Sequence, residues 1–239
     1  MPEPIQAGLW GALAASALVL AAIAALTLSV SRRFVALVMA FGAGALVSAL
    51  AFDLAEEAFR IGGTLIFGPG IAAGAVVYYV GDRLIDRIGH KRVTEGQTNG
   101  PAIVLGVLLD GIPESLVLGA TLIGGAGVSP SFLAAVLVSN LPEGLSGTRD
   151  LIDEGHPRGW VIGLWLAVVI AAGLAAAIGN AALSDIESKP LAFAQSFAAG
   201  AILTMLADTM FPEAFENGGD RVGLATALGF AAAFLLSRT

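Results

Sequence analysis

Residues 101–149 read PAIVLGVLLDGIPESLVLGATLIGGAGVSPSFLAAVLVSNLPEGLSGTR and hold two apolar runs, 101–123 and 130–149. Each run is long enough to cross a hydrocarbon core about 30 Å thick as a helix. Each also carries a proline followed by a glutamate near its middle, Pro113-Glu114 and Pro142-Glu143. An ionised side chain at that depth costs several kcal/mol. These residues therefore predict two transmembrane helices that share a polar site.

The rest of the chain continues this membrane-length pattern. Its 239 residues are 56% hydrophobic and 13% charged, with a mean hydropathy of +0.84, whereas about a quarter of the residues of a soluble domain are charged. We expect eight transmembrane helices, near 7–30, 35–58, 64–86, 101–123, 130–149, 159–183, 190–213 and 221–238. They use almost the whole chain, so residues 1–239 are predicted to form a single all-α integral membrane domain.

Basic residues are distributed unevenly between the connections of these helices. One side holds nine of the 12 Lys and Arg residues, namely Arg32, Arg33, Arg83, Arg87, Lys91, Arg92, Arg149, Arg158 and Arg221. The other side holds the remaining three. Because cytoplasmic loops collect Lys and Arg, we expect both termini outside the cytoplasm, with the protein in the inner (cell) membrane of a bacterium. The net charge of −7 disfavours nucleic acid as a partner.

Two pairs of segments match each other without a gap. Residues 41–59, FGAGALVSALAFDLAEEAF, match 197–215, FAAGAILTMLADTMFPEAF, and residues 108–116, LLDGIPESL, match 137–145, LVSNLPEGL. In the expected topology the two members of each pair run in opposite directions. Inverted repeats of this kind are the architecture of many secondary transporters. A shared bias toward Ala, Gly and Leu is the simpler explanation of the matches and stays open.

Polar side chains are placed so that they can meet across the two Pro-Glu helices. Asp110 and Glu114 are four residues apart on one helix face, and Ser139 and Asn140 precede Glu143 by four and three residues. The prolines also free backbone carbonyls, which suit a hard cation. Every Lys and Arg lies in a loop or near a helix end. Bound cations or protons are the counter-charges that remain, and neutral carboxylic acids bonded to each other are the alternative.

Two further aspartates extend this polar set. Asp208 lies deep in the expected helix 190–213, where the following Pro212 frees its carbonyl. Asp53 lies toward the outer end of the expected helix 35–58. We expect Asp208 near the bound cation and Asp53 in an entrance to the site.

With the motifs DGIPES at 110–115 and SNLPEG at 139–144, the chain resembles the ZIP (Zrt/Irt-like) family of divalent metal transporters. The resemblance extends to the eight-helix plan over the whole chain, and it implies a metal centre halfway across the membrane, extracytoplasmic termini and a homodimer. Carried over residue by residue, the metal ligands are Asp110, Glu114, Ser139, Asn140, Glu143 and Asp208. Asp110 stands where the family usually has histidine, and Gly111 stands where it often has asparagine.

These observations predict a transporter of divalent metal cations and no enzyme. The metal, Zn²⁺, Mn²⁺ or Fe²⁺, is the substrate. The candidate ligands are all oxygen donors, so we expect a site that handles Mn²⁺ or Fe²⁺ at least as well as a histidine-containing relative does. The alternative is a carrier of another solute, coupled to protons or other ions through the same carboxylates. An intramembrane protease is disfavoured because the sequence contains neither His-Glu-x-x-His nor Gly-x-Gly-Asp.

Overall fold

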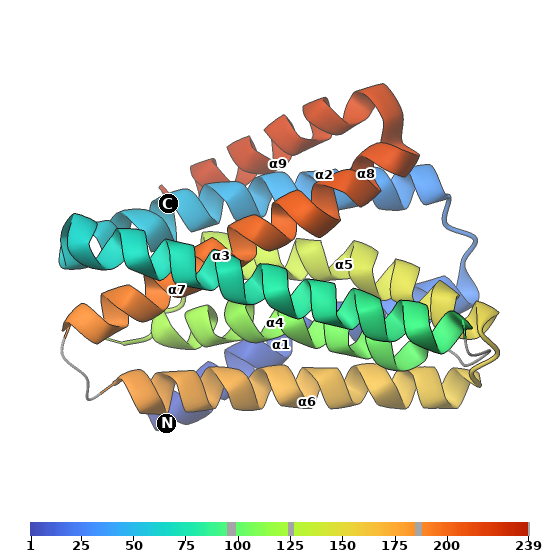
Figure 1. The fold of residues 1–239 in the computed structure, drawn as a ribbon, viewed down its shortest axis with the longest axis horizontal. Helices are drawn as coiled ribbons and strands as arrows, with labels where there is room; N and C mark the ends of the chain where they lie inside the picture. The colour runs from blue at the N-terminus through green and yellow to red at the C-terminus, as the bar shows by residue number, and fades with distance from the viewer. Residues whose placement is uncertain (95–98, 124–126, 185–187, 239) are drawn as a thin grey trace.

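The computed structural model describes residues 1–94, 99–123, 127–184 and 188–238 (Figure 1). The structure is 91% helical, with no strand in these ranges. The elements are α1 (Glu3–Thr27), α2 (Arg32–Ala49), η1 (Leu50–Ala55), α3 (Glu56–Thr94), α4 (Gly100–Ala120), α5 (Pro130–Asp153), α6 (Arg158–Leu183), α7 (Ser188–Met205), η2 (Leu206–Met210), α8 (Phe211–Gly218), η3 (Gly219–Arg221) and α9 (Val222–Leu236). The all-α prediction is confirmed.

Five helical stretches are long and apolar enough to cross a membrane within the described ranges: Glu3–Thr27, Arg32–Arg92, Gly100–Ala120, Arg158–Leu183 and Ser188–Leu236. Their length and composition are those of an integral membrane protein. The stretch Arg32–Arg92 has 61 residues and would measure about 90 Å as one straight helix. Instead, the chain reverses its direction between α2 and α3 and again between α8 and α9 (Figure 1).

Glycines in a left-handed backbone conformation mark both reversals. Gly63 has a φ of 58° and Gly219 a φ of 65°, values that residues with a Cβ rarely adopt. The first reversal lies inside the range assigned to α3, so the long part of α3 begins after Gly63. That part continues to Thr94, beyond the expected end at residue 86. The polar stretch 82–92, DRLIDRIGHKR, extends the helix past the apolar run.

The helices pack side by side in two groups. In one group α3 lies along α7, and α2 lies along α9; in the other, α1 packs against α5 and α6, and α4 packs against α6. Contacts of α2 with α5 join the two groups. The largest buried cluster includes Met39, Leu46, Phe132, Met205 and Leu206, which come from α2, α5, α7 and η2. The two Pro-Glu helices, α4 and α5, both belong to the second group, which α2 contacts through α5.

The two segments that match in sequence also match in local structure. A Cβ added to Gly44 would lie 2.0 Å from the backbone oxygen of Thr226 in α9, and a Cβ added to Gly200 would lie 2.1 Å from that of Ile71 in α3. Gly44 and Gly200 occupy equivalent positions of the match. Such small residues let helix backbones approach closely in a membrane. The pair α2 and α9 thus uses the same kind of contact as the pair α7 and α3.

A π-helical turn interrupts both of these segments at the same aligned position. η1 begins at Leu50 and η2 begins at Leu206. These turns contain Asp53 and Asp208, respectively. Single π-turns inside α-helices are rare and are frequent at functional sites. The predicted helix 190–213 corresponds to α7, η2 and the start of α8.

Candidate functional site

The two Pro-Glu motifs lie inside α4 and α5, as predicted. Glu114 is buried, with 2% of its surface exposed, and its Oε1 has no hydrogen-bond partner in the described part of the chain. Glu143 is half-buried. The charges that act on Glu143 come from Asp110, Glu114 and Glu213. Acidic groups from α4, α5 and α8 therefore share one electrostatic neighbourhood, and a cation would relieve their mutual repulsion.

Asp110 is held by a residue that sequence reasoning did not identify. The Oη of Tyr78 in α3 donates a hydrogen bond of 2.5 Å to Oδ1 of Asp110. Tyr78 is buried, and a buried tyrosine hydroxyl usually requires a polar partner, which was the available signal for this contact. The bond joins the two helix groups next to the candidate site and uses only Oδ1 of Asp110.

Ser139 and Asn140 are both buried in α5, but they contact different neighbours. The Oγ of Ser139 donates to the backbone oxygen of Val136 at 3.0 Å, within its own helix. The Nδ2 of Asn140 donates to the backbone oxygen of Ala14 in α1 at 3.1 Å. Asn140 and Glu114 line the same small cavity of about 10 Å³, which is about the size of one water. The structure thus brings Asn140 next to Glu114.

Asp53 lies far from this group, near the N-terminal end of α5. Its Oδ2 accepts a 2.7 Å hydrogen bond from the Oγ of Ser129 and another from the Oγ of Ser131. Ser131 and Glu143 lie on the same helix, about 18 Å apart along its axis. The pairing of Asp53 with these serines was not predicted, because their contact joins two segments that are distant in the chain.

Asp208 lies in η2, and its described acidic neighbour belongs to α3. Its side chain is exposed in η2, and its charge acts on Asp82 of α3. The extra residue in the π-turn changes which face of the helix each side chain occupies. The position of Asp208 beside the bound cation stays a prediction, and in this conformation its acidic neighbour is Asp82.

The acids form a loose group rather than a closed set of ligands. Across residues 1–94, 99–123, 127–184 and 188–238, no three His, Asp or Glu side chains are gathered closely enough to hold one ion. The convergence expected for Asp110, Glu114 and Glu143 is therefore limited to electrostatic range in this conformation.

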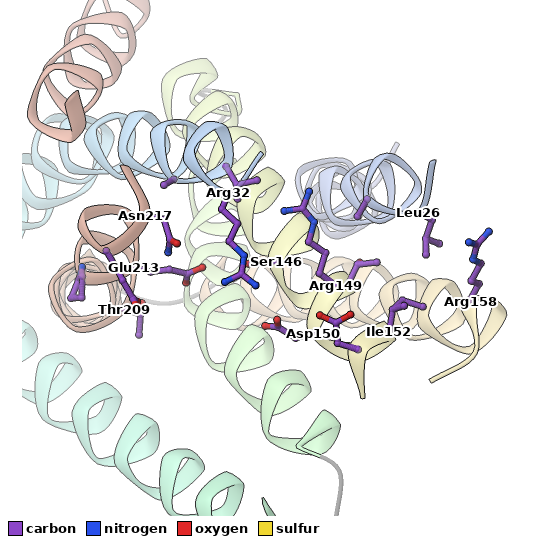
Figure 2. A pocket seen from close by; sticks show the side chains of 17 residues that line it. Leu26, Arg32, Ser146, Arg149, Asp150, Ile152, Arg158, Thr209, Glu213 and Asn217 are labelled. Carbon is purple, nitrogen blue, oxygen red and sulfur yellow. The ribbon is translucent and has the colours of Figure 1, made fainter. Parts of the chain in front are cut away.

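A cavity of about 780 Å³ opens beside the C-terminal half of α5. Figure 2 shows Thr209 and Glu213 on one wall, facing Ser146 and Asp150 of α5. Its charged lining residues are Arg32, Arg149, Asp150, Asp153, Arg158, Glu213 and Glu216. Ser146 lies three residues after Glu143 and also donates a hydrogen bond to the backbone oxygen of Pro142 at 2.9 Å. The cavity therefore reaches the α-helical turn that carries Glu143.

Comparison with known proteins identifies one kind of relative. No family model matches the chain. The chain is 26% identical over 182 residues to a protein of Arabidopsis thaliana named "Putative zinc transporter At3g08650". The aligned region covers 73% of this chain and 29% of the relative, so the chain spans less than a third of that protein's length. This relative is named as a zinc transporter, and the similarity is consistent with the resemblance to the ZIP family.

Proposed function

We propose that this protein carries a divalent metal cation across a membrane, using the carboxylates of α4 and α5 as its binding site. The observation that carries the proposal is Glu114, a buried acid with an oxygen that has no hydrogen-bond partner among the described residues. Asp110 and Glu143 lie within electrostatic range of it, and Asn140 lines the same small cavity. An acid in such a place is stable when a cation or a proton neutralises it.

The proposed architecture has eight spans. Two of the five membrane-length stretches reverse direction at Gly63 and Gly219, so each supplies two spans. The 24 residues of α5 supply the eighth, although Asn140 and Glu143 lower its apolarity. The shared π-turn and the equivalent contacts of Gly44 and Gly200 support an inverted repeat. A shared bias toward Ala, Gly and Leu explains these structural matches less simply than an inverted repeat does.

The two ends of α5 suggest access from one side. Hydrogen bonds to Asp53 tie the Ser129 end to η1, whereas the cavity of about 780 Å³ adjoins the Asp153 end. Arg32, Arg149 and Arg158 line that cavity, so the rule for basic residues assigns it to the cytoplasm. We propose an inward-facing state in which Asp53 belongs to the closed outer entrance. Both termini would then be extracytoplasmic, in the inner membrane of a bacterium, and a homodimer is the assembly we propose.

The donor atoms favour a broad choice of metal. Asp110, Glu114, Asn140 and Glu143 offer oxygen, and Ser139 adds a hydroxyl. Such ligands suit Mn²⁺ and Fe²⁺, while the general order of affinities still places Zn²⁺ above Mn²⁺ at any one site. We therefore propose Zn²⁺, Mn²⁺ and Fe²⁺ as the substrate class, with the metal as cargo and no reaction catalysed.

Uptake into proteoliposomes tests this proposal. Purified protein should admit Mn²⁺ or Zn²⁺, and the variant Glu114→Gln/Glu143→Gln should not, because two neutral amides cannot replace two anionic ligands. The variant should still insert and purify, since amides keep the shape of the side chains. Carboxylate-dependent proton movement without any metal uptake would instead favour the ion-coupled carrier of another solute.

A further inference from the structure

A second polar cluster lies apart from the acids described above, where the turn between α5 and α6 meets the first turn of α4. Its members are Asn99, Glu154 and His156. The backbone N–H of Asn99 donates to Oε1 of Glu154 at 3.0 Å, which positions the carboxylate at the start of α4. The ring of His156 stacks on Trp160, with centroids 4.2 Å apart and planes 13° apart. These two contacts hold the side chains of Glu154 and His156 in place. Neither contact uses Oε2 of Glu154 or Nε2 of His156.

Each of these three side chains has a buried polar atom with no hydrogen-bond partner in the described part of the molecule. The atoms are Oδ1 of Asn99, Oε2 of Glu154 and Nε2 of His156. A buried polar atom without a partner is costly, and all three of these atoms can donate an electron pair. The side chains of His156 and Glu154 are 21% and 23% exposed, so both residues border solvent while these atoms are covered.

The distance between two of these atoms is too long for a hydrogen bond and is compatible with a shared metal ion. Nε2 of His156 and Oε2 of Glu154 are 3.8 Å apart, beyond the usual range of about 2.7–3.2 Å for an N–H···O bond. A water bonded to both atoms would separate them by about 4.6 Å. Zinc bonds of about 2.0–2.2 Å allow a separation of about 3.4 Å at a tetrahedral angle and about 4.2 Å at most. The observed separation lies inside the range that a shared metal ion allows.

Gly100 keeps the space beside these atoms open. A Cβ at this position would lie 2.8 Å from Nε2 of His156 and 3.6 Å from Oε2 of Glu154. Any other residue would push the imidazole away from the carboxylate or occupy the place of an ion. The absence of a side chain at Gly100 is thus part of the geometry of the cluster.

We propose that Glu154 and His156, with Asn99 beside them, bind a divalent cation at a site separate from the acids of α4 and α5. The imidazole nitrogen gives this site a different preference, because Zn²⁺ favours nitrogen more strongly than Mn²⁺ does. The chain has two histidines, and the other, His90, lines a neighbouring cavity together with Asn99. The inference goes beyond the proposed transport and stands if that proposal fails.

The test uses the full chain with Glu114→Gln/Glu143→Gln, which removes two acids of the other site. Binding of ZnCl₂ alone is measured by equilibrium dialysis, and the zinc-edge X-ray absorption spectrum reports whether imidazole is a ligand. We expect Zn²⁺ bound with an imidazole signal. Adding His156→Ala should remove that signal and weaken this binding at least tenfold, and Gly100→Ala should weaken it while both ligands remain.

Two more variants control for damage to the fold. His90→Ala is the matched control, since it removes the chain's other imidazole and should leave the Zn²⁺ affinity and the imidazole signal unchanged. Glu154→Gln keeps an oxygen to accept from Asn99 but removes the charge, and should weaken binding severalfold. The proposal is overturned if the double variant binds no Zn²⁺ with an imidazole ligand, or if His156→Ala leaves the signal in place while His90→Ala abolishes it. Uptake by the double variant bears only on the proposed transport function.

Discussion

The two ends of α5 lie in different surroundings. At the N-terminal end, Ser129 and Ser131 donate hydrogen bonds to Asp53, and Ser131 is 1% exposed. At the C-terminal end, Ser146 and Asp150 line a cavity of about 780 Å³ (Figure 2). Glu143 lies between these ends. This difference is what we expect of the proposed inward-facing state, in which the acids in the middle of the bundle are reached from one side only.

The largest expected effect is a difference in reactivity between two cysteines introduced on α5. The chain has no cysteine of its own. Ala135, which is 1% exposed, lies in the N-terminal half, and Ser146 lines the cavity. A water-soluble thiol reagent should modify Ser146→Cys roughly 100-fold faster than Ala135→Cys, which corresponds to an opening cost of about 2.8 kcal/mol for the buried position. Equal rates of modification at the two cysteines would contradict the proposed difference between the two ends of α5.

The same reagents establish which end faces the cytoplasm. In sealed cells, an impermeant reagent should label Glu3→Cys from outside and should label Asp153→Cys only after the membrane is opened. This follows from the excess of Arg near the Asp153 end. Labelling of Asp153→Cys in intact cells would reverse the proposed orientation but would leave the difference between the two ends of α5 intact.

A smaller effect is expected when the closed end is loosened. Replacing Asp53 with Ala removes both hydrogen bonds to the serines of α5. A hydrogen bond to a charged group contributes about 1.5–3 kcal/mol, so the rate of modification at Ala135→Cys should rise about tenfold. Glu57→Ala is the matched control, because Glu57 pairs with Arg60 of its own helix at 2.6 Å. A similar rise with Glu57→Ala would show that the effect is not specific to Asp53.

Uptake should depend less on Asp208 than on Glu143. Asp208 is exposed and its charge acts on Asp82, whereas Glu143 lies among the acids of α4 and α8. We expect Asp208→Asn to lower the rate of metal uptake about fivefold, the equivalent of about 1 kcal/mol, and Glu143→Gln to abolish it. Complete loss in Asp208→Asn would place Asp208 at the cation after all, in a conformation other than this one.

The smallest expected effect is a change in metal preference. Asp110→His introduces a nitrogen ligand and should raise the ratio of Zn²⁺ to Mn²⁺ affinity about threefold or more, because zinc favours nitrogen donors. Tyr78→Phe is the control: it deprives Asp110 of its hydrogen bond without adding nitrogen, and it should leave the ratio unchanged. Competition between the two metals measures both variants. An unchanged ratio in Asp110→His would contradict the assignment of Asp110 as a ligand.

The sequence predicted the helices more completely than their mutual contacts. Apolar run length locates α4, α5 and α6, and the Pro-Glu motifs place Glu114 and Glu143 in the middle of their helices. The reversal at Gly63 was expected as a break between spans, since that break separates two apolar runs. These features are local in the sequence, so hydropathy and helical spacing predict them.

Features that depend on contacts between distant helices were not predicted. Neither the contact of Tyr78 with Asp110 nor that of Asp53 with Ser129 and Ser131 leaves a mark in the spacing of either segment. The position of the Asp208 side chain was not predicted either. A π-turn adds one residue to a helical turn, which changes the helix face that the following side chains occupy. The cavity beside Ser146 is lined by residues of six elements, α1, α2, α5, α6, η2 and α8, and no single segment encodes how they are arranged.

Equilibrium binding of Mn²⁺ to the purified protein tests the central claim most directly. Mn²⁺ is the suitable probe because it favours oxygen donors and competes weakly for the proposed histidine site. We expect wild type to bind Mn²⁺ at the acids of α4 and α5, and Glu143→Gln to bind it roughly 100-fold more weakly, or about 2.8 kcal/mol, while remaining folded. Equal Mn²⁺ affinity in wild type and Glu143→Gln would contradict the account, since the cation would then be held elsewhere.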